Sequence, residues 1–151
     1  MELIIVLLII VTIAGIALPR FGKATERAND TRRIADLNTI QKALELYFAE
    51  NGTYPLAADW SGDAPSYGGH GYTATDPYIL GLVPDFIEML PRDPNKAYPA
   101  ESHGYIYKSD GKDYKVLAHE TPTSFPTDHR FFDSARPTWA YQVSSKGGAN
   151  W

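Results

Sequence analysis

Hydrophobic residues fill the first eighteen positions of the chain almost without interruption. Residues 3–18 contain no charged side chain, and Glu2 is the one charge that precedes them. The apolar positions surround a helix drawn through this stretch, which is typical of a helix in lipid or inside a bundle of helices. The run is slightly shorter than the ~20 apolar residues that usually span a bilayer. A cleaved signal peptide would begin with basic residues, so the acidic start favours a segment that is retained.

Beyond residue 33 the hydrophobic positions recur every three or four residues. This spacing predicts a helix with one apolar face, which packs on the rest of the protein. The face is formed by Ile34, Leu37, Ile40, Leu44 and Tyr47. Asn51-Gly52 and then Pro55 end the helix. A helix over about residues 1–51 would be about 75 Å long. This length exceeds the diameter of a domain built from the remaining residues, so the N-terminal half of the helix must project.

Short strand-like runs separated by turn residues occupy the second part of the chain. Residues 105–118 predict a hairpin, because Asp110-Gly111 favours a tight turn between two strands. A further strand is predicted at residues 138–144, whereas residues 60–72 are rich in Gly, Ser and Pro and predict an irregular loop. The predicted fold class is α+β, with one long N-terminal helix packed on a small antiparallel β-sheet of three or four strands.

Composition places the chain among globular proteins and narrows its chemistry. It has 151 residues, of which 44% are hydrophobic and 21% charged, with a net charge of −4. The absence of cysteine excludes disulfides, thiolate zinc sites and a cysteine nucleophile. A mildly acidic chain lacks the broad basic surface that general nucleic-acid binding needs, so no nucleic-acid partner is implied.

Charge is distributed unevenly along the chain. Residues 20–33, the basic collar, carry five basic and two acidic residues, whereas the chain from residue 34 onward carries nine basic and fifteen acidic residues. Arg20, Arg32 and Arg33 of this collar are therefore candidates for contacts with the acidic surface of a neighbouring copy. The alternative is a solvated helix face that acts as an interfacial anchor.

The residues give little support to catalysis. The four histidines have no metal-ligand spacing, and each is expected in a solvated loop. Nucleophile-elbow, phosphate-loop and zinc-protease motifs do not occur. We therefore expect neither an enzyme nor a resident cofactor. Asp128 and Asp133 are weak candidates for a calcium site, although two exposed loop carboxylates are the simpler interpretation.

The order of these features resembles the type IV pilin superfamily. Its specific part is the N-terminal third: Glu2-Leu-Ile-Ile-Val, the 17-residue interval to Pro19, and the helical stretch from Ile34-Ala-Asp-Leu-Asn to Tyr47. Residues 90–94 and 105–114 are more weakly similar to head segments of such proteins. The chain is most similar to the short, disulfide-free pilins and to the major pseudopilin of type II secretion.

The resemblance implies three segments and a structural role. Residues 1–19 would form the half-helix that lies in the membrane and then in the filament core. Residues 20–51 would pack on the head, and residues 52–151 would form the globular, β-rich head. The subunit would sit in the inner membrane until pilus or secretion assembly machinery polymerises identical copies into a filament on the cell surface.

The resemblance also gives roles to two residues near the N-terminus. Glu2 would be the family's glutamate, which is thought to face the free, often methylated, α-amine of a neighbouring subunit. A carboxylate inside an apolar bundle is costly unless a cation faces it, in agreement with this role. Pro19 would be the family's helix-interrupting proline. The family's processing motif, a short basic leader ending in glycine and then a phenylalanine, is missing, so we expect the sequence as given to lack its first residues.

Two other interpretations stay open. A major pseudopilin, whose short filament remains in the periplasm, makes nearly the same demands on the sequence, and calcium ligands in the C-terminal loop would distinguish it. A monomeric, single-pass membrane-anchored binding domain would explain the apolar run. It would explain neither the acidic residue at its start nor the continuous amphipathic helix to Asn51.

Overall fold

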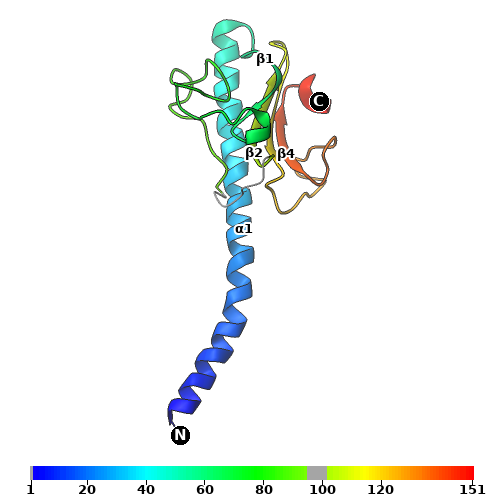
Figure 1. Cartoon of the computed structure of the whole chain (residues 1–151). Helices are drawn as coiled ribbons and strands as arrows, with labels where there is room; N and C mark the ends of the chain where they lie inside the picture. The colour runs from blue at the N-terminus through cyan, green and yellow to red at the C-terminus, as the bar shows by residue number, and fades with distance from the viewer. Residues whose placement is uncertain (1, 95–101) are drawn as a thin grey trace.

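A long helix and a small sheet make up the protein (Figure 1). The computed structural model describes residues 2–94 and 102–151, without the side chains of residues 2 and 13–21. The elements are α1 (Glu2–Asn51), β1 (Ala57–Gly62), β2 (Gly104–Ser109), β3 (Tyr114–His119), β4 (Ala140–Ser144) and two single-turn 3₁₀ helices, η1 (Pro65–Tyr67) and η2 (Gly148–Asn150). The predicted α+β class is therefore confirmed.

Helix α1 runs without a break, and its N-terminal part projects far beyond the head (Figure 1). The backbone is helical at Pro19, so the interruption that the resemblance implies there is not present in the single chain. The projecting half curves gently away from the axis of the covered half (Figure 1). The helix ends where the sequence predicted: Gly52 has a φ of 72°, and its N–H donates to the carbonyl of Phe48 at 2.8 Å.

The four strands form one antiparallel sheet in the order β1-β2-β3-β4. The predicted hairpin is confirmed, with Ser109 opposite Tyr114. The carboxylate of Asp110 fixes its turn, because it accepts the N–H groups of Lys112 and Asp113 at 2.9 and 2.7 Å. The predicted strand near the C-terminus is also present, as β4.

Strand β1 corrects the prediction of an irregular loop from residue 60. Residues 60–62 pair with β2 as the end of an edge strand, with an irregularity in the register between Ala57 and Ser61. Gly62 lies so close to β2 that an added Cβ would be 2.6 Å from the carbonyl oxygen of Tyr105. The glycine that indicated a loop is thus required for the close approach of two backbones.

The main core lies between the covered half of α1 and one face of the sheet. Leu37, Ile40 and Leu44 are fully buried there, and Ile34 and Tyr47 pack at its edges. The predicted helix face is therefore confirmed. Aromatic and branched side chains of β2, β3 and β4 face the helix across this core. They include Tyr105, Tyr107, Tyr114, Val116 and Val143.

Candidate functional site: the projecting half of α1 and the rim of the head

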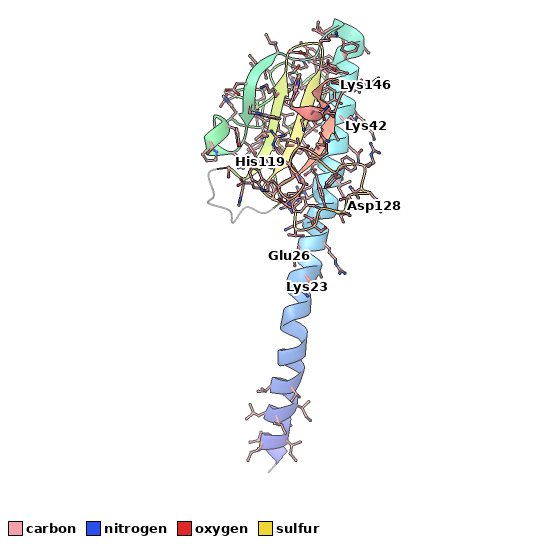
Figure 2. All side chains as sticks on the ribbon, turned by 90° about the vertical axis from the view of Figure 1, so that its right-hand side faces the viewer. Lys23, Glu26, Lys42, His119, Asp128 and Lys146 are labelled. Carbon is pink, nitrogen blue, oxygen red and sulfur yellow. The ribbon has the colours of Figure 1, made fainter. Side chains whose placement is uncertain are left out.

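The projecting half of α1 exposes a continuous apolar surface. All nine side chains from Leu3 to Val11 are more than half exposed, and the side chains at the N-terminal end of the helix point into open space (Figure 2). The hydroxyl of Thr12 donates within the helix to the carbonyl of Ile9 at 2.8 Å, which suits apolar surroundings. An exposed apolar surface of this extent marks an interaction site. Within the part of the chain that the structure describes, no helix is both long enough and apolar enough to cross a membrane.

Three of the predicted assembly residues lie in the least described part of the helix. The side chains of Glu2, Pro19 and Arg20 are outside the described residues, although the backbone is helical at all three. Their roles stay predictions.

The exposed part of the basic collar lies just below the head. Lys23 and Arg27 are exposed and form no ion pair with any described residue, and their spacing of four places them on one helix face; Figure 2 shows Lys23 below the head. Arg32 is also exposed, and its Nε lies 3.9 Å from the carboxylate of Asp36. These three cations are available to a partner.

Arg33 differs from the rest of the collar and corrects our expectation. Its guanidinium is 1% exposed and donates two hydrogen bonds to the carboxylate of Asp93, at 2.7 and 2.8 Å, and one to Asp30 at 2.7 Å. Burial alone would lower the pKa of Arg33, but the two carboxylates outweigh this effect and raise it. Because its donors are taken by its own chain, Arg33 is not available to a neighbouring copy.

The cluster around Arg33 joins α1 to two loops at the lower rim of the head. Asp30 lies one helical turn before Arg33 and accepts the hydroxyl of Thr123 at 2.6 Å and its backbone N–H at 3.1 Å. Asp93 belongs to the loop that follows residue 90. We call Asp30, Arg33, Asp93 and Thr123 the rim cluster. The spacing of Asp30 and Arg33 was visible in the sequence, but nothing indicated the distant partners.

The weak calcium candidates are not brought together by the fold. Asp133 is fully buried, and its carboxylate accepts Lys115 Nζ at 3.0 Å and lies 3.4 Å from Arg136 Nη1. Asp128 is exposed in the preceding loop. Among the described residues there is no group of three or more His, Asp or Glu side chains that could hold a metal ion. A basic side chain thus takes the place that a cation would need at Asp133.

Lys115 is a buried charge that the sequence pattern did not indicate. Its ammonium also donates to the backbone oxygens of Ala149 and Trp151, at 2.9 and 3.0 Å. Burial lowers the pKa of Lys115, and the adjacent Asp133 partly opposes this change. The pair attaches the C-terminal segment to the outer face of β3.

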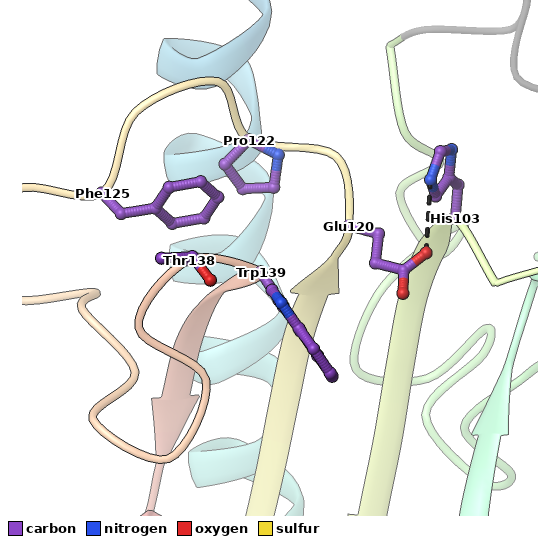
Figure 3. Close-up of a pocket in the computed structure, with 6 residues that line it drawn as sticks. All are labelled: His103, Glu120, Pro122, Phe125, Thr138 and Trp139. Carbon is purple, nitrogen blue, oxygen red and sulfur yellow. Dashed lines mark ion pairs between the residues drawn. The ribbon is translucent and has the colours of Figure 1, made fainter.

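Two histidines lie in the folded head instead of in solvated loops. His119 is buried at the end of β3, with Nδ1 2.9 Å from the carbonyl oxygen of Ser102. His103 lies 3.3 Å from Glu120 beside a pocket of about 240 Å³ (Figure 3). The other residues that line the pocket are Pro122, Phe125, Thr138 and Trp139. The His103–Glu120 ion pair and the indole of Trp139 lie on its wall, and the expectation that the chain is not an enzyme stays a prediction.

No family model matches the chain, and neither the curated proteins nor the solved structures include a significant match to it. Its residue pattern and its geometry are therefore the basis for a proposed role.

Proposed function

We propose that this chain is the structural subunit of a type IV pilus-like filament and polymerises through its apolar N-terminal half-helix. The observation that carries the proposal is the contrast within α1. One half forms the core of the head, while residues 3–11 project with every side chain more than half exposed. Burying one such aliphatic side chain contributes about 1.5–3 kcal/mol, so nine of them strongly favour lipid or other copies of the helix over water.

In this proposal, lipid and neighbouring subunits cover the half-helix in turn. It is held in the inner membrane before assembly and then extracted by the pilus machinery into a bundle of identical half-helices. Heads form the outer surface, and head-to-tail contacts that do not close give an open helical polymer. Glu2 faces the α-amine of a neighbour in that bundle, and Pro19 is the position at which the helix loosens on assembly.

One feature of the head supports a pilus over a secretion pseudopilus. Calcium ligands in the C-terminal loop would distinguish a major pseudopilin. Here the carboxylate of Asp133, one of the two candidate ligands, instead accepts a hydrogen bond from Lys115 at 3.0 Å and is not free to bind an ion. A tethered monomer, in turn, has no use for an acidic residue at the start of its anchor.

A matched pair of substitutions tests the proposal. Leu8 and Leu46 both lie on α1 and are 65% and 59% exposed, the first on the projecting half and the second beside the head. In cells that produce the chain, Leu8→Glu should abolish filaments in sheared material seen by electron microscopy, while Leu46→Glu should still yield them. Mass spectrometry of the filaments should identify the chain.

The controls separate loss of assembly from loss of fold. Both variants should keep the unfolding transition of the head, measured on the full chain in detergent micelles. Glu2→Ala should also slow assembly sharply, whereas a simple anchor would tolerate it. Filaments of normal yield from Leu8→Glu would contradict the proposal, as would wild-type material without filaments and with the chain confined to the membrane.

A further inference from the structure

A firmly anchored segment of the head presents an acidic and apolar surface. Residues 76–89 lie on the side of α1 away from β4 (Figure 1). Tyr78, Ile79 and Leu82 are buried and hold the segment against the core, and the hydroxyl of Tyr78 donates to the carbonyl of Pro91 at 3.0 Å. Leu90 is buried directly after the segment, and between these anchors Leu80 and Met89 are 67% and 53% exposed. We call the exposed part of residues 76–89 the acidic ledge.

Charge on this ledge is of one sign. Residues 73–90 contain three acidic residues and no lysine or arginine. Asp76 has a partner in His70, at 3.1 Å, whereas Asp85 and Glu88 are exposed and form no ion pair with any described residue. Two uncompensated carboxylates beside two exposed apolar side chains fit a partner surface that is basic and has small residues.

The complementary surface is on the same chain, below the head. Lys23 and Arg27 share a helix face, with the exposed Ala24 on one side of it and the exposed Glu26 on the other; Figure 2 shows Lys23 and Glu26 below the head. We call Lys23, Ala24 and Arg27 the basic stripe. It lies on the part of α1 that the head leaves bare, whereas the ledge lies beside the covered part (Figure 1). No described ion pair joins the two surfaces within one chain, so a second copy shifted along the helix axis is needed to bring them together.

We infer that the acidic ledge of one copy binds the basic stripe of the next. This inference rests on the proposed function and names the contact that the heads add to the helix bundle. The two surfaces are different patches of the same chain, so the contact is heterologous and repeats without closing. Exposed charge pairs are individually weak, so the contact sets register and salt dependence, while the apolar half-helices supply most of the driving force.

The absence of cysteine allows a direct test by disulfide cross-linking. Ala24→Cys in one full-length copy and Met89→Cys in another leave every charge of both surfaces in place. Mixed in micelles, transferred to assembly conditions and oxidised, these copies should give a cross-linked dimer in several-fold excess over a control pair. The control combines Ala24→Cys with Lys146→Cys, another exposed position. A chain that carries both Ala24→Cys and Met89→Cys should give a ladder of oligomers.

Charge reversal completes the test. Lys23→Glu with Arg27→Glu on the Ala24→Cys copy should reduce the cross-link to the control level. Asp85→Lys with Glu88→Lys on the Met89→Cys copy should restore it. A cross-link no stronger than the control, or one that ignores both reversals, would overturn the inference. Binding of the stripe to anionic lipid vesicles without a specific cross-link would overturn it as well.

The readouts keep this inference separate from the proposed function. Filaments with an unselective cross-link would overturn the ledge contact and leave the filament proposal intact. A selective, charge-dependent cross-link without filaments would keep the contact and contradict the filament. Loss of both would contradict both.

Discussion

Leu8 and Leu44 lie on the same helix, yet the first side chain is 65% exposed and the second is fully buried. Residue type and secondary structure do not differ between these two positions of α1; the presence of the head does. The covered half is stabilised by its own chain, whereas the projecting half depends on lipid or on other copies. The comparison teaches that burial of one end of a helix can stabilise the fold of its own chain, while burial of the other end can favour assembly with lipid or other copies.

The charged residues repeat this contrast at the boundary of the head. Arg27 is exposed and has no ion-pair partner among the described residues, whereas Arg33, less than two turns later, is buried and gives three hydrogen bonds to two carboxylates. The rim cluster therefore marks where the covered half begins. It also joins α1 to two loops of the head at this point.

The largest expected effect comes from breaking the rim cluster. Arg33→Met removes the buried guanidinium that Asp30 and Asp93 bind, and should lower the free energy of unfolding of the head by about 3–5 kcal/mol. Arg27→Met is the matched control and should change it by less than about 0.5 kcal/mol. Denaturant unfolding of the full chain in micelles measures both. Similar small effects of both substitutions would show that Arg33 and Arg27 contribute equally to stability, and would contradict the contrast drawn between them.

The sequence predicted those parts of the molecule that depend on local patterns. The face from Ile34 to Tyr47 follows from the helical period, the helix end from Gly52, and the hairpin from Asp110-Gly111. In each case residues close in the sequence determine the structure. The exposed half-helix was predictable for the same reason, because a run that is apolar on all sides cannot be covered by so small a head.

Features that depend on distant residues were not predictable. Arg33 was assigned to a neighbouring copy because the sequence shows its charge and not its partner Asp93, which lies 60 residues away. Asp133 was considered for calcium because nothing places Lys115 beside it. Residues 60–62 contain loop-forming residues, and only the pairing with β2 makes them a strand.

The same substitution, leucine to alanine, in the two halves of α1 should give a smaller difference in stability. Leu44→Ala removes buried methyl groups and leaves a cavity, and should lower the free energy of unfolding of the head by about 2–5 kcal/mol. Leu8→Ala removes the same atoms from an exposed site and should change it by less than about 0.5 kcal/mol. The midpoint of thermal unfolding in micelles reports the difference. An equal loss for Leu8→Ala would mean that the projecting half contributes to the fold of the head.

Two largely buried carboxyls of the folded chain, one on α1 and one after β1, make the stability of the head depend on pH. Burial under the head raises the pKa of Asp36 on α1, although the hydroxyl of Tyr105 and the adjacent Arg32 oppose the rise. Burial likewise raises the pKa of Asp63 to about 6, against the opposing effects of the N–H of Tyr105 and the side chain of Arg92. Both carboxyls therefore hold their protons more tightly in the folded chain than in the unfolded chain.

The smallest expected effect follows from Asp63. As the pH rises from about 4 to above 6, the unfolded state loses this proton first, so the head should lose about 1–3 kcal/mol of stability through this group. Asp63→Asn should remove that loss and raise the unfolding midpoint at pH 7 while changing it little at pH 4. Asp110→Asn is the control of opposite sign, because backbone N–H groups of the hairpin turn lower the pKa of Asp110 and stabilise its charged form. Compared with wild type, Asp110→Asn should be less stable at pH 7, and the difference between the two should be smaller at pH 3. Parallel pH profiles for wild type and Asp63→Asn would show that the burial of Asp63 does not control this pH dependence.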